Sequence, residues 1–155
     1  MTFAVRAALA ASLTIGASGP GLAGATVPPA QANDSLQERC TGASTQAETL
    51  GCYAAAAAKS RAEVERAFER NLQTARALDR EWNAHASHHI LGSVLRKQLK
   101  VSQAAWLSYS QSQCSFEGGS SFGGSGTDIL DAACHYRLNS QRLSELNAAY
   151  KLLNR

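Results

Sequence analysis

The sequence contains no run of 18 or more apolar residues, so no segment of it is expected to span a membrane. It shows no sustained alternation of apolar and polar residues, which argues against β-strands. The GxSxG, Walker and HExxH motifs are absent, and no other catalytic constellation stands out. These absences predict an all-α protein that is not an enzyme and has no cofactor.

An excess of charge of one sign is also lacking. The chain has 15 Lys and Arg residues against 12 Asp and Glu residues, a net charge of +3. Basic and acidic residues alternate, as in RAEVERAFER (residues 61–70), which is typical of a solvated helix surface. This interleaving argues against a nucleic-acid-binding surface.

The N-terminus carries the pattern of a secretory signal peptide. Arg6 precedes a short apolar stretch, AALAASLTIGA (residues 7–17), and small-residue cleavage motifs end at Ala25 and at Ala32. We therefore expect residues 1–32 to be removed and residues 33–155 to form the mature domain. No lipobox-like cysteine follows the signal directly, so a soluble periplasmic or secreted protein is predicted.

The chain has four cysteines, all of them after the signal peptide. An even number of cysteines in an exported chain predicts disulfides. Three pairings are allowed and the sequence does not choose among them, although Cys40–Cys52 and Cys114–Cys134 are the simplest. Each of these would contribute about 3 kcal/mol in the chain-entropy treatment. The absence of CxxC, with spacings of 12 and 20, argues against a zinc site.

A histidine cluster, HASHH, is the other group with metal-ligand chemistry. His85, His88 and His89 stand at i, i+3 and i+4, so all three would share one helix face. No carboxylate or cysteine stands at a matching spacing, and we interpret the cluster as a solvated helix end without metal.

Three amphipathic helices are predicted. TQAE fits a capping box with Thr45 as N-cap and Glu48 at N3, so a helix is expected from Gln46 into the eighties, with a break near residues 59–62 left open. Its apolar face consists of Val64, Phe68, Leu72, Ala75, Leu78 and Trp82. Both tryptophans, Trp82 and Trp106, are expected in the core.

The second and third helices have comparable stripes. The second is expected over residues 90–114, with its inward face formed by Leu91, Leu95, Leu99, Ser102, Trp106 and Tyr109. The third should run from the N-cap Thr127, with Asp128 in its first turn, to the C-terminus. Its face is Ile129, Ala132, Tyr136, Leu143, Leu146, Tyr150 and Leu153. A small antiparallel bundle of about three main helices with two disulfides follows.

Five glycines lie between Cys114 and Cys134, in CSFEGGSSFGGSGTDILDAAC. The stretch follows a predicted helix and no lysine follows at the Walker spacing, so it is not a phosphate loop. Two interpretations stay open: a tethered loop displayed to a partner, whose docking entropy the tether lowers, or a connection stapled for stability. Glu117 is a lone acid within the expected loop, where it would contact a partner or cap a turn.

The same region resembles the LprI-like lysozyme-inhibitor family, whose members are small exported helical domains. The resemblance covers roughly residues 40–150. It rests on a Gln-x-x-Trp-x-x-Tyr run before a cysteine, a glutamate three residues after it, Gly-Gly-Ser before a second cysteine, and a Leu, Arg, Leu helix. The matching residues are Gln103, Trp106, Tyr109, Cys114, Glu117, Gly123, Gly124, Ser125, Cys134, Leu138, Arg142 and Leu146. Upstream, CTGASTQAETLGC matches the family's first cysteine pair, with Thr45, Gln46 and Glu48 inside it.

This resemblance implies a partner, either a lysozyme or another protein of the cell envelope. A loop over residues 117–127 would block the glycan cleft of a lysozyme sterically. The candidate contact residues are Glu117, Gly123, Gly124, Ser125 and Asp128. Lysozymes attacked by such inhibitors are commonly basic, so a local acidic patch is expected. Its candidate members are Asp34, Glu38, Glu48, Glu117, Asp128 and Asp131. The alternative function is a structural or adaptor domain of the envelope with no effect on lysozyme.

Overall fold

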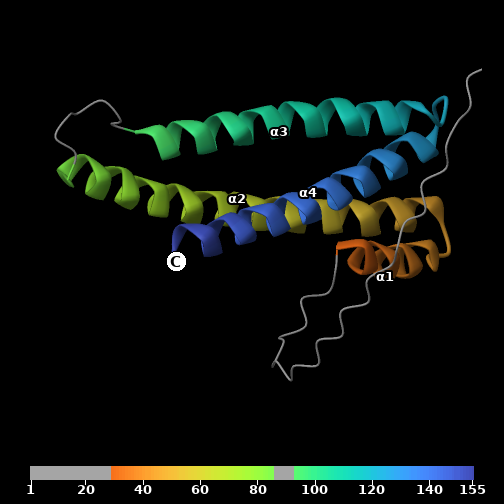
Figure 1. Ribbon diagram of the computed structural model, residues 1–155. Coiled ribbons are helices and arrows are strands. Elements are labelled where there is room, and N and C mark those ends of the chain that lie inside the picture. The colour runs from red at the N-terminus through yellow and green to blue at the C-terminus, as the bar shows by residue number, and fades with distance from the viewer. Residues whose placement is uncertain (1–28, 86–92) are drawn as a thin grey trace, which may run out of the picture.

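The computed structural model describes residues 29–85 and 93–155, and side chains within these ranges from Ser35 onward. These residues form four helices and no strand: α1 (Pro29–Thr41), α2 (Gln46–His85), α3 (Val94–Gly119) and α4 (Ser125–Leu153) (Figure 1). The predicted all-α bundle is confirmed, and α1 adds a short fourth helix. The signal peptide, with its two cleavage positions, lies outside the described side chains and stays a prediction.

The start of α2 is fixed by the expected capping box. Thr45 Oγ1 accepts a hydrogen bond from the Glu48 amide at 3.2 Å, and the Glu48 carboxylate accepts from the Ser44 and Thr45 amides at 3.0 and 3.2 Å. These bonds satisfy amide groups that a helix start leaves without partners. The helix then continues without interruption to His85, so the break considered near residues 59–62 does not occur.

Helices α2 and α4 lie side by side and run in the same direction. Asn139 Nδ2 donates to the Ala57 carbonyl at 3.1 Å, and Asn71 Nδ2 donates to the Leu146 carbonyl at 2.9 Å. From the first bond to the second, the contact moves from Ala57 to Asn71 on α2 and from Asn139 to Leu146 on α4. Residue numbers thus increase together along the two helices, by 14 and by seven, as expected for parallel helices. Since both sites are buried, these bonds replace hydration of the amides.

Helix α3 runs antiparallel to both and covers them from one side (Figure 1). Its first turn is held by Asp79 of α2, whose two carboxylate oxygens accept from the Leu95 amide at 3.1 Å and the Arg96 amide at 3.2 Å. Arg96 Nε also donates to this carboxylate at 3.2 Å. Asp79 thus acts as the cap of α3 from a different helix.

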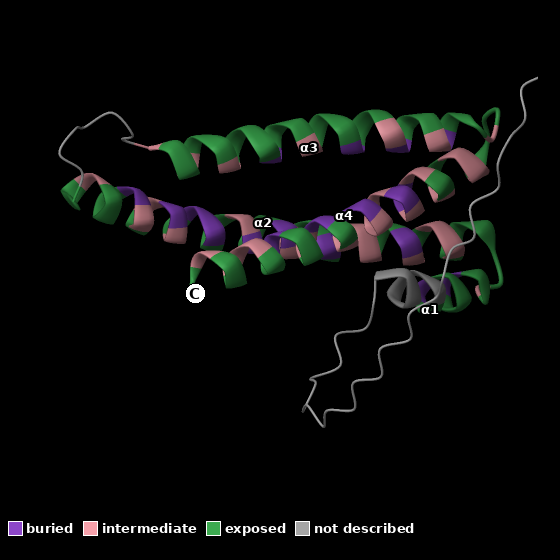
Figure 2. Cartoon of the chain, in the orientation of Figure 1, coloured by how far each residue is buried: buried purple, intermediate pink, exposed green. Residues whose placement is uncertain are grey.

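Buried residues lie on the sides of the helices that face one another (Figure 2), and their side chains form three hydrophobic clusters. Leu36 and Cys40 of α1 pack against Tyr53 and Ala132. The second cluster contains Val64, Ala67 and Leu146, and the third contains Cys114, Cys134 and Leu138. Helix α1 therefore closes the bundle over the starts of α2 and α4. Among the described helices, none is long and apolar enough to cross a bilayer.

The predicted inward face of α3 is confirmed at Leu99 and Trp106, which pack against the second cluster, and is wrong at three other positions. Tyr109 and Leu95 are 54% and 40% exposed, and Ser102 is exposed. Buried instead are Gln103, Ser110, Cys114 and Gly118. Polar groups face inward because partners on α4 satisfy them, and a stripe drawn through apolar residues misses this. Leu91 lies outside the described residues.

The two tryptophans differ in their surroundings. Trp106 is partly buried and packs against the second and third clusters, as expected. Trp82 is 63% exposed, so its expected place in the core is wrong. Helix α4 ends at Leu153, seven residues beyond the contact of Leu146 with Asn71, and so it does not reach the α2 turn that carries Trp82.

Candidate functional site at the disulfide end

Both disulfides lie at the same end of the molecule, where α1 meets α2 and α3 meets α4. Cys40 pairs with Cys52 and Cys114 pairs with Cys134, with Cα atoms 5.5 and 5.4 Å apart. The pairing expected as simplest is therefore the one observed. We call residues 35–57 and 107–137 the disulfide end. Disulfides are typical of proteins in oxidising compartments.

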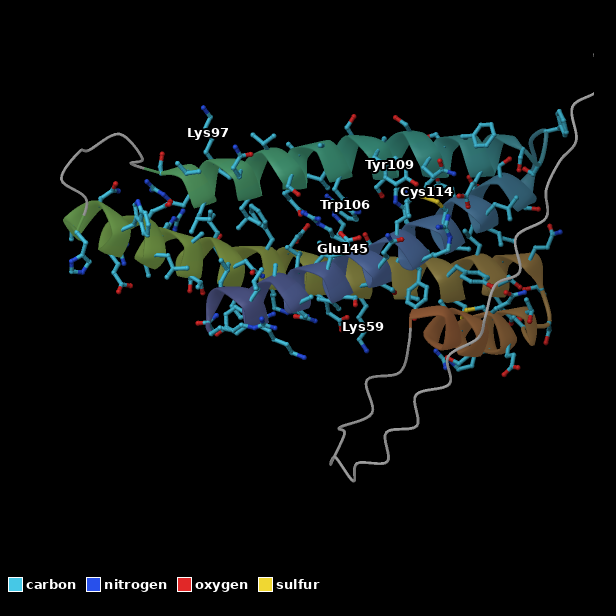
Figure 3. The ribbon with its side chains drawn as sticks, viewed as in Figure 1. Lys59, Lys97, Trp106, Tyr109, Cys114 and Glu145 are labelled. Atoms are coloured by element: carbon cyan, nitrogen blue, oxygen red, sulfur yellow. A yellow bond between two sulfur atoms is a disulfide. The ribbon has the colours of Figure 1, made fainter. Side chains whose placement is uncertain are left out.

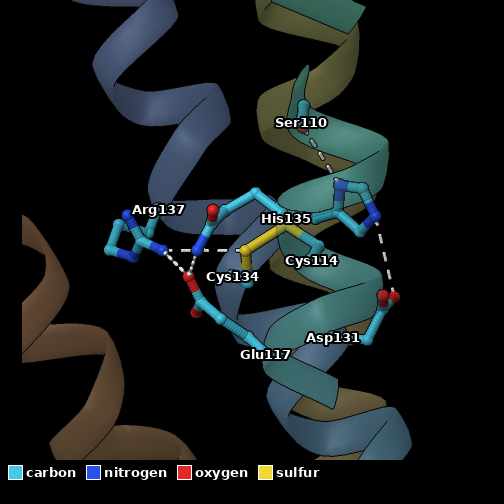
Figure 4. The surroundings of a disulfide bond; sticks show 8 residues. Ser110, Cys114, Glu117, Asp131, Cys134, His135 and Arg137 are labelled. Atoms are coloured by element: carbon cyan, nitrogen blue, oxygen red, sulfur yellow. Dashed lines mark hydrogen bonds and ion pairs between the residues drawn. A yellow bond between two sulfur atoms is a disulfide. The ribbon is translucent and has the colours of Figure 1, made fainter. Parts of the chain in front are cut away.

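Glu117 lies beside the second disulfide (Figure 4). It belongs to α3, so the expectation that it lies in a loop is wrong. Its Oε1 accepts from Gln113 Nε2 at 2.8 Å and from Arg137 Nη2 at 2.5 Å. The Gln113 hydrogen bond lowers the pKa of the Glu117 carboxyl below its usual value, with Arg137 acting in the same direction and burial opposing. Glu117 is therefore a link between α3 and α4.

Helix α3 continues through the first two glycines because α4 approaches it there. A Cβ atom at Gly118 would lie 3.0 Å from the Thr127 carbonyl oxygen and 3.3 Å from Asp131 Cβ. A side chain at this position would force α4 to shift, so glycine suits the close approach of the two helices. The prediction that the glycine stretch ends the helix at Cys114 is thus wrong by five residues.

The connection between α3 and α4 is short, and we call residues 120–124 the tip loop. Phe122, Gly123 and Gly124 have φ values of 55°, 98° and 80°, so the turn needs the left-handed conformations that glycine adopts readily. Ser121 Oγ donates to the Gly118 carbonyl at 2.9 Å and lies 2.7 Å from Thr127 Oγ1. The loop is therefore compact and held at both ends.

Helix α4 begins earlier than predicted. Its N-cap is Gly124, not Thr127, and its first residue is Ser125. Thr127 lies in the first turn, where its amide donates to the Gly124 carbonyl at 3.1 Å. Asp128 is in the first turn as expected, where a carboxylate is favourable near the positive end of the helix dipole.

The five predicted contact residues separate into two groups. Gly123, Gly124 and Ser125 form the turn itself, with Asp128 exposed one turn later. Ser125 Oγ donates to Gln46 Oε1 and so links α4 to the start of α2. Glu117 lies one turn before the loop and faces Arg137. Four of the five predicted contact residues therefore lie in or beside the tip loop. The fifth, Glu117, instead links α3 to α4 through Arg137.

Two phenylalanines at this end went unnoticed in the sequence. Phe122 at the tip is 100% exposed, and Phe116, close before it on α3, is 73% exposed. Exposed aromatic side chains in neighbouring positions are common at protein interfaces. The signal was available, since Phe122 stands alone among glycines and serines.

The disulfide end is acidic although the whole chain is basic. It contains five acidic and two basic side chains, a net charge of −3, against +3 for the chain. Glu38, Glu48, Glu117, Asp128 and Asp131 all belong to it, whereas the side chain of Asp34 lies outside the described residues. Glu48 and Glu117 are engaged in the helix cap and the Arg137 pair. Asp128 is the exposed acid nearest the tip loop along the chain.

A serine, a histidine and an aspartate also lie in series on α3 and α4 (Figure 4). Ser110 Oγ is 3.4 Å from His135 Nδ1, and His135 Nε2 is 3.6 Å from Asp131 Oδ2. The three residue types match those of a hydrolase triad, but the Ser–His and His–Asp distances are longer than those of a working triad. All three belong to helices, whose backbone amides are bonded within the helix and not available as oxyanion donors. We therefore treat them as polar contacts between α3 and α4.

The histidine cluster is only partly described. His85 is the last residue of α2 and is exposed, while His88 and His89 lie outside the described residues. Within the described ranges, no group of three His, Cys, Asp or Glu side chains has an arrangement that would hold a metal ion.

Comparison with protein families gives one match. The family model described as Lysozyme inhibitor LprI matches residues 37–146, which include all four cysteines and the tip loop. Comparisons with curated proteins and with solved structures give no match.

Proposed function

The chain belongs to the LprI lysozyme-inhibitor family, and on this premise we propose that it is an exported protein that binds and inhibits a lysozyme. Inhibition would occur in the periplasm or outside the cell, where the disulfides are stable. The mechanism is steric: the tip loop enters the glycan-binding cleft of the lysozyme and excludes its substrate. No chemistry by this chain is required.

The observation that carries this proposal is the full exposure of Phe122 at the tip of a stapled helical hairpin. An aromatic ring that enters a cleft buries a large apolar area and gives a central anchor for binding. Phe116, exposed on the last turns of α3, adds a second apolar side chain at this end of the molecule. The neighbours of Phe122 in the sequence, Ser121, Gly123 and Ser125, are small residues that would allow close approach of a partner.

The tip loop is held in shape before any partner arrives. The Cys114–Cys134 disulfide and the Glu117–Arg137 pair fix the two helices, and Ser121 and Ser125 fix the two ends of the loop. Ordering a loop on binding costs conformational entropy, and a loop that is already ordered avoids that cost. The sequence left open a displayed loop and a stapled connection, and this geometry allows both to be true.

The negative charge of the disulfide end favours a cationic partner. Long-range attraction between a net charge of −3 at this end and a basic lysozyme would orient the encounter with the tip loop forward. Asp128 is exposed beside the loop and is the acid that we assign to a direct contact. Glu117 acts indirectly, because it holds the helix ends together.

A lysis assay tests the proposal. Mature protein with intact disulfides is titrated against c-type, g-type and i-type lysozymes acting on peptidoglycan. Dose-dependent protection is expected against at least one of them. Phe122→Ala should weaken the inhibition about tenfold or more, as expected for an interface anchor. Trp82→Ala is the matched control, because it removes an exposed aromatic residue at the other end.

Two results would contradict the proposal at different levels. Protection that is unchanged in Phe122→Ala and in a variant with a replaced tip loop would keep the inhibition but exclude this surface. No protection against any of the three lysozymes would favour the alternative, an envelope adaptor domain. That alternative has its own observation: Trp82, Val94 and Leu95 are exposed and line a common apolar groove.

A further inference from the structure

A groove of about 410 Å³ lies between α2, α3 and α4, and we call it the central groove. Its lining includes Val64, Gln103, Trp106, His135 and Asn139. The volume falls in the range of small-molecule sites, roughly 300–1,000 Å³. The tip loop takes no part in it, so the groove is a separate feature from the surface assigned to lysozyme.

The alanine run of α2 keeps this groove open. Ala57 and Ala58 of α2 and Ala132 of α4 belong to the lining, and none of them has a side chain long enough to fill the space. Trp106 of α3 supplies the large apolar surface, and Figure 3 shows its side chain between α3 and α4. The Arg142 guanidinium lies over one face of the indole ring, 5.8 Å from the ring centroid, which leaves the other face for a ligand.

Two buried amide side chains each have one polar atom with no hydrogen-bond partner among the residues that the structure describes. Asn139 Nδ2 donates to the Ala57 carbonyl and to Ser60 Oγ, both at 3.1 Å, which turns its Oδ1 away from α2. Gln103 Oε1 accepts from Arg142 Nε at 3.1 Å, which leaves Gln103 Nε2 unbonded among the described residues. The orientation of each amide is fixed by its partner, because a carbonyl accepts and a guanidinium donates.

Both side chains that carry these atoms belong to the central groove. Asn139 and Gln103 are 4% and 8% exposed, and both line the groove. Among the described residues, the buried polar atoms that lack both a partner and contact with solvent are Asn71 Oδ1 and Asn83 Oδ1, not these two. Gln103 Nε2 and Asn139 Oδ1 are therefore not sealed from solvent, and we infer that the groove which both residues line is their access. It offers one donor and one acceptor from nearly buried side chains.

The charged groups around the groove are already paired. Arg61 Nε lies 3.1 Å from Glu65 Oε1, and His135 Nε2 lies 3.6 Å from Asp131 Oδ2. A charged ligand would have to compete with these pairs, whereas a neutral ligand would not. The groove thus favours a neutral ligand with hydrogen-bonding groups and one apolar face.

We propose that the central groove binds an N-acetylated amino sugar within an oligosaccharide. The apolar face of a pyranose ring packs against Trp106, and an acetamido group supplies both a carbonyl for Gln103 Nε2 and an N–H for Asn139 Oδ1. The methyl of that group fits against the alanines of α2. This site would let the protein hold an amino-sugar glycan independently of its contact with lysozyme.

Tryptophan fluorescence provides the test. The chain has two tryptophans, so Trp82→Phe leaves Trp106 as the only indole. This variant, with disulfides intact, is titrated with tri-N-acetylchitotriose and with maltotriose. A saturable change is expected with chitotriose at millimolar concentration or below, and none with maltotriose, which lacks acetamido groups. No saturable change with chitotriose, or an equal response to the two sugars, would overturn the proposal.

Variants locate the site without removing any native hydrogen bond. In the Trp82→Phe background, Ala58→Leu should fill the groove and weaken chitotriose binding at least tenfold. Ala55→Leu, the matched control, adds the same side chain to an exposed position of α2 outside the lining. Equal binding by the two variants would exclude the groove. Phe122→Ala should bind chitotriose as the parent variant does. Loss of glycan binding and loss of lysozyme inhibition can therefore be told apart.

Discussion

Glu117 on α3 and Arg137 on α4 form an ion pair at 2.5 Å beside the disulfide that joins the same two helices. The pair is half-exposed, so its direct contribution to stability is small. Its position matters more, since Gln113 and Arg137 together hold the Glu117 carboxylate on the side of α3 that faces α4.

The first prediction concerns pH. The pKa of Glu117 is lowered in the folded protein, so folding favours the ionised carboxyl. The ionised Glu117 carboxylate stabilises the folded protein fully at pH values above 4.5, the ordinary pKa of a glutamate. This stabilisation is lost as the pH falls through the lower pKa of the folded state. Glu117→Gln should therefore be less stable than the wild type at pH 7 and lose less stability on acidification. Urea unfolding at pH 7 and pH 3 measures this. Glu81→Gln, at the other end, should behave as the wild type does, and equal pH dependence of all three would contradict the assignment.

The second prediction concerns Asn71, which is fully buried. Its Nδ2 donates to the Ala67 and Leu146 carbonyls, both at 2.9 Å. Asn71→Asp replaces this donor by an oxygen that faces two carbonyl oxygens in a desolvated site. We expect a loss of about 3 kcal/mol or more in the free energy of unfolding. Asn147→Asp is the control: that exposed residue accepts from Arg70 Nη2 at 2.6 Å, and an aspartate keeps the acceptor. Similar losses in the two variants would refute the buried role of Asn71.

The third prediction concerns the start of α2. Thr45→Ala removes the side chain that accepts from the Glu48 amide. The expected cost is about 1 kcal/mol in the free energy of unfolding, as for other N-caps. Chemical denaturation measures it, with the exposed Ser112→Ala in α3 as a neutral comparison. A Thr45→Ala protein as stable as Ser112→Ala would mean that the cap contributes nothing.

The fourth prediction concerns association with lysozyme and rests on the proposed inhibition. Asp128→Lys should lower the association rate constant about tenfold at low salt and reduce its dependence on ionic strength. Glu81→Lys changes the net charge by the same amount but lies far from the tip loop, so it should have a much smaller effect. Stopped-flow kinetics at two salt concentrations compares them. Equal effects would show that only the total charge matters, not its position.

Much of the fold was predictable because local signals agree with tertiary structure. Thr45 and Glu48 define the start of α2, and the alanine run continues it. The disulfides follow the simplest pairing because each joins helix ends that a short connection already brings together. Such features depend on neighbours in the sequence, which a single chain displays directly.

The errors concern contacts between distant segments. Gln103 and Ser110 turn inward because Arg142 and His135 of α4 are there to receive them, and the α3 sequence alone does not show this. Gly118 reads as the start of a loop but serves the close approach of α4. In the candidate site, the connection at Gly123 and Gly124 was predicted, whereas the pairing of Glu117 with Arg137 joins two helices and is not visible in the sequence around either residue.

Because both disulfides lie at one end of the molecule, local stability is highest at that end and decreases towards the other. Covalent bonds prevent separation of the helices near Cys52 and Cys134, while the last turns of α2 and α4 have only non-covalent contacts. Partial opening therefore begins far from the cystines and moves towards them, and amide protons should exchange with solvent in that order. The helices can separate transiently at the end without disulfides while the disulfide end keeps its packing.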